Sequence, residues 1–126
     1  MIKEKQNIKN YNIEFGQKSE DFAEEFIKNK GFIIIKKNFR LGKYGEIDII
    51  ANDKDTLVFL EVKARTNDKY GEPEEAVTFS KQRNIRRIAE SYLYINKIEN
   101  VPCRFDVISI KYNHGNKEIK HIENAF

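Results

Sequence analysis

Two short apolar segments joined by a polar turn constrain the fold of this chain more than any other feature. Residues 46–51 (Glu-Ile-Asp-Ile-Ile-Ala) and 57–64 (Leu-Val-Phe-Leu-Glu-Val-Lys-Ala) are rich in β-branched and aromatic residues, which favour strands. Residues 52–56 between them are typical of a turn. The pattern predicts a hairpin centred on Lys54 and Asp55, in which the numbers of opposed residues sum to about 109.

Alternation along this hairpin separates a polar face from an apolar face. With the predicted register, Asp48 faces Glu61 and Glu46 faces Lys63, so one face carries four charged side chains. The other face is predicted to be a core layer and carries Ile47, Ile49, Val58, Leu60 and Val62. A slip of one residue would destroy this division, so the hydrophobic pattern itself supports the pairing.

The segments around the hairpin predict one α/β domain. The chain has 126 residues, which favours a single domain, and we expect residues 1–12 to form a flexible arm and residues 13–126 to fold. The further elements expected are a helix over 13–30, a strand over 32–35, a basic loop over 38–44, a polar loop over 66–75, a helix over 75–96, a strand over 101–112 and a weak edge strand over 118–123. This αβββαβ order predicts a mixed, mainly antiparallel sheet with a helix on each face.

Composition excludes several classes of protein. No apolar run approaches the roughly 20 residues needed to span a bilayer, the charged N-terminus predicts no signal peptide, and the single Cys103 fits a reducing cytoplasm. The net charge is only +3, but residues 13–25 are acidic and residues 36–44 and 80–97 are basic. An acidic segment beside two basic segments suggests that the protein binds a polyanionic partner, with a cation between the partner and the acidic residues. Ordinary solvent-exposed faces would give the same distribution of charge.

The polar face of the hairpin is the candidate for chemistry. Two carboxylates directly opposite one another repel, so Asp48 and Glu61 require a shared proton, a nearby Lys63 or Arg65, or a divalent cation with oxygen ligands. A cation there would polarise a phosphate and lower the pKa of a bound water, and Lys63 would orient or deprotonate that water. The alternative is an exposed face with a Glu46–Lys63 pair.

Two further residues are candidates because of their helical positions. Glu20 lies about 60° from Ala23 around the first helix, on the rim of the apolar stripe, where it could reach a metal or remain a surface carboxylate. Lys81 falls within the apolar stripe of the second helix. It either extends past the end of that helix or holds a phosphate, and we expect a carboxylate or phosphate beside it, because burying an unpaired lysine is costly.

Basic side chains elsewhere are candidates for contacts with nucleic acid. Arg40 and Arg65 flank the hairpin, and we expect both side chains to contact the sugar-phosphate backbone of a nucleic acid. On the outer side of the second helix lie Arg83, Arg86 and Arg87, which indicate either phosphate contacts or solubility charge. Tyr44 and Tyr70 could stack on bases or simply pack. We expect Cys103 in the core and an Arg104–Asp106 ion pair at the sheet edge, and we assign no role to His114 and His121.

The ordered set of motifs resembles the PD-(D/E)XK nuclease superfamily, and within it the uncharacterised YraN-like family, which is similar to archaeal Holliday junction resolvases. The residues that carry the resemblance are Gly45-Glu-Ile-Asp-Ile-Ile and Phe59-Leu-Glu-Val-Lys-Ala-Arg, with Gly16…Ser19-Glu20, Gly31-Phe, Asn38-Phe-Arg40, Gly71…Glu75-Ala-Val…Lys81 and Arg104-Phe-Asp-Val. It covers roughly residues 14–110. The superfamily's proline before the aspartate is Ile47 here.

The resemblance implies a restriction-endonuclease-like domain that depends on Mg²⁺ or Mn²⁺. It places Asp48, Glu61, the Val62 carbonyl and Glu20 around the metal, and Asp48, Glu61, Lys63 and Glu20 in the catalytic site. The expected function is hydrolysis of phosphodiester bonds in DNA, including branched or repair intermediates, by a cytoplasmic protein that could act as a homodimer. The alternatives are a nucleic-acid-binding or adaptor module with the same fold, and a hydrolase of RNA or nucleotides.

Overall fold

The computed structural model of the chain describes residues 2–66 and 77–126. Its helices and strands are α1 (Ile2–Asn29), β1 (Ile33–Arg40), a short 3-10 helix η1 (Gly42–Tyr44), β2 (Glu46–Asp53), β3 (Thr56–Arg65), α2 (Phe79–Ile95), β4 (Cys103–Asn113) and β5 (Asn116–Ile122). The predicted order of helices and strands is confirmed, and the weak C-terminal strand is present. No described helix is long and apolar enough to cross a membrane.

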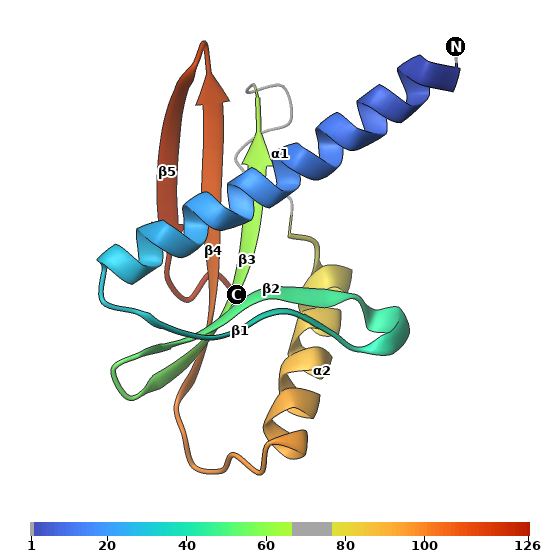
Figure 1. The fold of residues 1–126 in the computed structure, drawn as a ribbon. Coiled ribbons are helices and arrows are strands. Elements are labelled where there is room, and N and C mark those ends of the chain that lie inside the picture. The colour runs from blue at the N-terminus through green and yellow to red at the C-terminus, as the bar shows by residue number, and fades with distance from the viewer. Residues whose placement is uncertain (1, 67–76) are drawn as a thin grey trace.

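The five strands lie side by side in chain order (Figure 1). β3 and β4 are parallel, and the other three neighbouring pairs are antiparallel. Parallel neighbours need a connection that returns to the same end of the sheet, and α2 lies on that connection. The prediction of a mixed, mainly antiparallel sheet is therefore confirmed.

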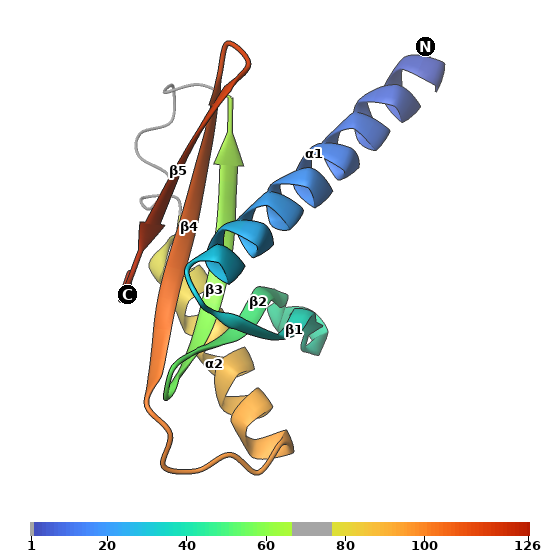
Figure 2. The ribbon, with the colours of Figure 1, turned by 60° about the vertical axis from the view of Figure 1, so that its left-hand side comes forward.

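Each face of the sheet is covered by one helix, as predicted (Figure 2). α1 buries Ala23 and Ile27 on one face, against a cluster that includes Ile49, Leu60 and Ile108. α2 covers the other face, where its buried side chains pack with Ile47, Ile50, Leu57, Phe59 and Val107. Both faces of β3 are thus buried, which explains why its apolar run is continuous rather than alternating.

The hairpin of β2 and β3 has the predicted register over its closed end. The paired residues run from Asp53↔Thr56 to Ile49↔Leu60, and each pair sums to 109. The pairing ends there, so the expected pairs of Asp48 with Glu61, of Glu46 with Lys63 and of Ile47 with Val62 are not formed. Glu46 instead pairs with Arg40 of β1, and Ile47 packs in the cluster under α2 rather than with Ile49. The cause is that β2 follows β1 away from β3 (Figure 1).

The ends of several elements differ from the prediction. α1 begins at Ile2 rather than at residue 13, so the segment predicted as an arm is helical. Residues 2–12 contain neither proline nor glycine, and nothing in them interrupts a helix. β1 continues to Arg40, through the first part of the predicted basic loop, because that stretch pairs with β2.

Two other boundaries concern the ends of the helices. α1 ends at Asn29, and the expected cap residue Gly31 has a φ of 96°. The N–H of Phe32 donates to the Ile27 carbonyl at 3.0 Å, and the N–H of Gly31 donates to the Lys28 carbonyl at 2.9 Å, which is a Schellman cap. α2 begins at Phe79 with Thr78 as its N-cap. The predicted loop over 66–75 with Tyr70, and the predicted helix start at residue 75, lie largely on residues 67–76, outside the described residues.

Candidate functional site

The site begins where β2 and β3 separate. Beyond Ile49↔Leu60 the two strands no longer pair, and the side chain of Asp48 accepts a hydrogen bond from the Val62 N–H at 2.8 Å through Oδ2. The N–H and carbonyl of one strand residue point to the same side of the strand, so the Val62 carbonyl faces the same gap. The separation therefore exposes backbone and side-chain oxygens that a regular sheet would hide.

A cavity of about 720 Å³ occupies this gap. It brings together all four predicted catalytic residues, Glu20, Asp48, Glu61 and Lys63, and Val62, whose carbonyl was predicted as a metal ligand. The wall also includes further residues of α1, the end of β1, the turn before β2, β2, β3 and the start of α2, namely Gly16, Ser19, Arg40, Tyr44, Gly45, Glu46, Ala64, Thr78, Ser80, Lys81, Asn84 and Ile85. Six parts of the fold thus converge on one polar cavity.

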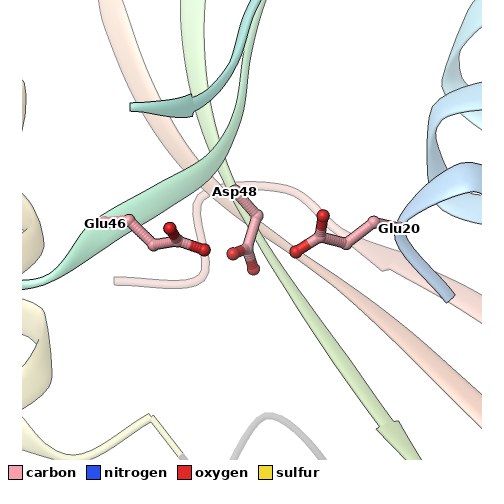
Figure 3. Close-up of side chains that lie close together, drawn as sticks. All are labelled: Glu20, Glu46 and Asp48. Atoms are coloured by element: carbon pink, nitrogen blue, oxygen red, sulfur yellow. The ribbon is translucent and has the colours of Figure 1, made fainter. Parts of the chain in front are cut away.

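Three carboxylates form a cluster in this cavity. Oxygen atoms of Glu20, Glu46 and Asp48 all lie within 4.8 Å of one another, with Glu20 approaching from α1 and Glu46 from β2 on either side of Asp48 (Figure 3). Burial, followed by repulsion from Asp48 and Glu46, raises the pKa of Glu20 to about 7. Burial is also the main cause that raises the pKa of Asp48. The cluster therefore needs protons or a cation to compensate its charge.

Glu61 completes the acidic side of the cavity. This residue is only 3% exposed, and its Oε2 lies 3.3 Å from the Nζ of Lys81. Its Oε1 is buried and has no hydrogen-bond partner among the described residues. Burial and then repulsion from Asp48 raise the pKa of Glu61 to about 7. A buried carboxylate oxygen without a partner is costly, so the structure leaves a ligand position open at Glu61.

Two lysines supply positive charge to the same cavity. Lys63 is half-buried, and burial together with the neighbouring Lys81 lowers its pKa. Burial also opposes the charge of Lys81, but its contacts with Lys63 and Glu61 outweigh that effect and raise its pKa. The expectation of a carboxylate or a phosphate beside Lys81 is confirmed by the carboxylate of Glu61. One lysine thus stays charged, while the other is more easily deprotonated.

The residues present fit a divalent cation of the Mg²⁺ or Mn²⁺ type. Such ions prefer oxygen ligands at about 2.1 Å, so two ligands on opposite sides of the ion lie about 4.2 Å apart. The oxygens of Glu20, Glu46 and Asp48 already lie within 4.8 Å of one another, and small side-chain rotations would close the difference. The unpartnered oxygen of Glu61 and the Val62 carbonyl offer further oxygen ligands on the same cavity wall.

Glu46 is a functional candidate that the sequence interpretation placed with Lys63 rather than with the acids. The alternation of side chains along the strand placed Glu46 on the same face as Asp48, and this pattern could have indicated that Glu46 belongs with the acidic residues. The missing information was the separation of β2 from β3, which removes Lys63 as the partner of Glu46. Arg40 takes that place, with Nη2 3.6 Å from Oε2 of Glu46.

The predicted nucleic-acid contacts divide into two groups. Arg40 and Lys81 line the cavity. Arg65, Arg83, Arg86 and Arg87 do not belong to its wall. Arg65 has a buried Nε without a partner among the described residues, and Arg83 is exposed on α2. Of these six predicted contacts, Arg40 and Lys81 are thus the ones that line the cavity with the carboxylates.

The remaining two arginines of α2 pack against aromatic rings. The guanidinium of Arg86 lies 4.7 Å from the centroid of the Phe105 ring. Arg87 donates a 2.9 Å hydrogen bond to the Tyr44 hydroxyl and lies 5.2 Å from the centroid of that ring. Tyr44 itself lines the cavity, so Arg87 positions one wall of the site.

A second group of charged residues lies away from this cavity, around Asp106. Arg104 donates from Nε to Oδ1 of Asp106 at 2.9 Å, and Nε2 of His121 lies 2.7 Å from Oδ2. The predicted Arg104–Asp106 pair is confirmed, and it lies in the first part of β4, which pairs with β3 but precedes the stretch, from Val107 onward, that pairs with β5. Cys103, expected in the core, is exposed.

Comparison with known proteins places the chain in a family. Residues 19–110 match the model of the family described as "Uncharacterised protein family UPF0102". A UPF0102 protein of Caldicellulosiruptor saccharolyticus is 44% identical over 115 residues, which covers 90% of this chain and 97% of the relative. Relatives from Thermodesulfovibrio yellowstonii and from Clostridium botulinum strain Kyoto are 46% identical over 114 residues and 48% identical over 118 residues, and cover 90% and 91% of this chain and 96% and 95% of their own lengths. The chain therefore belongs to the UPF0102 family.

Proposed function

We propose that this protein is a divalent-metal-dependent endonuclease that hydrolyses phosphodiester bonds in DNA. The observation that carries the proposal is the single cavity in which the Glu20–Glu46–Asp48 cluster meets the buried Glu61 and two lysines. The motif order that resembles the PD-(D/E)XK superfamily supports the same reaction. Membership of that superfamily, and the similarity to resolvases, are part of this proposal.

The acidic side of the cavity would hold the cation. Asp48, Glu20 and Glu46 supply carboxylate oxygens, and Glu61 and the Val62 carbonyl lie on the same wall. When bound, Mg²⁺ or Mn²⁺ supplies Lewis-acid polarisation of the phosphate and a lowered pKa for water. A bound phosphate would pair with the positive side chains of the cavity, because Lys81 and Arg40 both line it.

The two lysines would have different roles in the reaction, one in proton transfer and the other in binding the phosphate. Burial and Lys81 favour the neutral form of Lys63 relative to an exposed lysine, and that neutral form would accept the proton of the attacking water at Nζ. Lys81 remains charged and donates hydrogen bonds to phosphate oxygens, where negative charge accumulates. The water oxygen forms a bond to phosphorus, the bond from phosphorus to the leaving sugar oxygen breaks, and solvent returns a proton to that oxygen.

Cleavage of end-labelled DNA tests the proposal. Four-way junction, duplex and single-stranded DNA, with single-stranded RNA beside them, are incubated with Mg²⁺, Mn²⁺ or EDTA. We expect metal-dependent cutting of DNA that falls about 10²-fold to 10⁴-fold in Lys63→Ala, because a general base contributes about that factor. The control is Lys36→Ala, which removes an exposed lysine of β1 outside the cavity wall and should cut like the wild type.

Other outcomes would favour the alternative functions. Cutting that survives in Lys63→Ala contradicts the proposed site. Salt-sensitive DNA binding without cutting, unaffected by Asp48→Ala, favours an adaptor module. Faster cutting of RNA than of any DNA favours an RNA hydrolase.

A further inference from the structure

A glycine in the interior of α1 faces the cavity. Gly16 is one of the residues that line the cavity wall, and it lies well inside α1, whose ends are Ile2 and Asn29. Glycine is unfavourable in the interior of a helix, because its backbone loses the most freedom on folding. Alanine at such a position favours folding by about twofold to fivefold in the equilibrium constant, so the glycine at position 16 requires an explanation.

The two usual reasons for a glycine do not apply to Gly16. Glycine serves where the backbone needs a positive φ, and every other described glycine has one: Gly31, Gly42, Gly45 and Gly115. The φ of Gly16 is not in that range. Glycine also serves where another element packs too closely for a side chain, but a Cβ atom added to Gly16 would have no atom of the described residues within 4 Å.

The remaining reason is a ligand that closely approaches the helix backbone. Gly16 precedes Glu20 by four residues, which places both on the same side of α1 and about 6 Å apart along its axis. Glu20 belongs to the carboxylate cluster, and its neighbour Ser19 also lines the cavity. A ligand whose phosphate lies at the cluster can therefore reach Gly16 with the next part of its chain.

The helix surface at Gly16 offers van der Waals contact rather than hydrogen bonds. Inside a helix the backbone N–H and carbonyl groups are already paired with one another, and glycine adds no side chain. The acidic Glu20, one turn away, disfavours a second phosphate at this position. The part of a polynucleotide that fits such a surface is a sugar, which is neutral and compact.

We propose that the deoxyribose next to the scissile phosphate packs against α1 at Gly16, so that the substrate strand continues along this helix away from the cation. This inference rests on the proposed function and adds a binding position to it. The substrate is then a polynucleotide whose chain continues beyond the phosphate that is cut, as in endonuclease cleavage. A side chain at position 16 would occupy the place of the sugar.

Larger side chains at position 16 test the inference. Gly16→Ala and Gly16→Leu are compared with the wild type by fluorescence anisotropy, using a fluorescein-labelled single-stranded DNA and a labelled duplex, with Ca²⁺ in place of Mg²⁺ and strand length checked afterwards. The matched control is Gln17→Leu, because Gln17 is the next residue of α1, is exposed and is not part of the cavity wall.

We expect opposite effects of Gly16→Ala on stability and on DNA binding. Urea denaturation should show an equilibrium constant for folding that is about twofold to fivefold larger, because the added methyl group has open space and alanine favours the helix. DNA binding should become weaker, and Gly16→Leu should weaken it by about tenfold or more, because crowding a close contact commonly has an effect of that size. Gln17→Leu should bind DNA like the wild type.

Mn²⁺ binding distinguishes a blocked strand from a damaged cation site. Gly16 supplies no side-chain ligand, so Gly16→Leu should bind Mn²⁺ within about twofold of the wild type, measured by electron paramagnetic resonance. Weaker DNA binding with normal Mn²⁺ binding and a more stable Gly16→Ala supports the inference, even if the wild type cuts nothing.

The remaining outcomes overturn the inference. Unchanged DNA binding by Gly16→Leu, or an equal loss in Gln17→Leu, does so and leaves the nuclease proposal open. A less stable Gly16→Ala would mean that the glycine is structural, and a loss of Mn²⁺ binding in Gly16→Leu would mean that the effect acts through the cation. Failure of the wild type to bind any DNA at low salt overturns both the inference and the proposed function.

Discussion

Glu61 and Asp106 are both buried carboxylates on neighbouring parallel strands, yet their surroundings differ completely. Asp106 is fully buried and is contacted by Arg104, His121 and the Asn124 N–H. Burial opposes its charge, but these partners outweigh burial and lower its pKa. Glu61 has Lys81 at one oxygen and no described partner at the other, and its pKa is raised to about 7.

The contrast between Asp106 and Glu61 separates charges that stabilise the fold from charges that the fold does not require. The partners of Asp106 come from β4, β5 and the residues after β5, and Arg104 also reaches Asp53 of β2 at 3.1 Å. This group joins distant parts of the sheet, so its charge serves stability. Lys81 and Arg40 compensate the charge of Glu61 and of the nearby cluster only in part, and the pKa values of Glu20 and Glu61 remain raised; such groups are candidates for binding and catalysis.

The largest effect we expect on stability comes from Asp106→Asn. Removing this charge leaves the mostly buried Arg104 and His121 without their central partner, and breaking a buried ion pair costs about 3–5 kcal/mol. Urea denaturation followed by circular dichroism measures the free energy of unfolding. Asp55→Asn, in the exposed turn of the hairpin, is the control and should lie within about 0.5 kcal/mol of the wild type. If Asp106→Asn lowers the free energy of unfolding by less than about 1 kcal/mol, the charge of Asp106 is not structural, and the distinction between Asp106 and Glu61 fails.

A smaller effect should come from metal binding, and it should depend on pH. Glu20 and Glu61 have folded pKa values of about 7 against ordinary values of 4.5, so the folded state holds more protons between those limits. Without metal, the protonated forms of Glu20 and Glu61 favour the folded state. This contribution to the free energy of unfolding is fully present below about pH 4.5 and is lost as the pH rises through about 7. Above pH 7, the same oxygens are free for a cation.

At pH 8, Mn²⁺ at 100 times its Kd should therefore raise the free energy of unfolding by about 2.7 kcal/mol. The same concentration should have much less effect at pH 5, where the cation must displace protons. Thermal denaturation in Mn²⁺ and in EDTA, at equal ionic strength, provides the measurement. Equal stabilisation at both pH values would argue against the carboxylates as the ligands.

The smallest effect should come from Glu61→Gln without metal. The amide removes a charge that burial and Asp48 disfavour, and this gain offsets the loss of the ion pair with Lys81. We expect the free energy of unfolding at pH 8 to stay within about 1 kcal/mol of the wild type, measured as for Asp106→Asn. A loss as large as that of Asp106→Asn would mean that the charge of Glu61 is structural.

Local patterns were sufficient to predict the parts of the structure that depend on period and burial. The register of the closed end of the hairpin is the one predicted from the turn centred on Lys54 and Asp55, although β3 is buried on both faces rather than on one. That register brings Asp48 near Glu61, and helical periodicity placed Glu20 at the rim of α1. The cost of burying Lys81 alone predicted its acidic partner.

The rest depends on contacts between distant segments, which no local pattern records. The separation of β2 from β3 arises because β2 continues to pair with β1, and this separation gives Glu46 its place in the cluster. His121 reaches Asp106 only because β5 pairs with β4.

Direct titration of Mn²⁺ is the measurement closest to the central claim, that the acidic cavity holds a divalent cation. Free Mn²⁺ is followed by electron paramagnetic resonance at pH 8 in wild type and in Asp48→Asn, whose amide oxygen can still accept the Val62 N–H. We expect saturable binding by the wild type and at least about tenfold weaker binding by the variant, because one charged ligand is lost. No binding by the wild type at millimolar Mn²⁺, or equal binding by both proteins, would contradict the account.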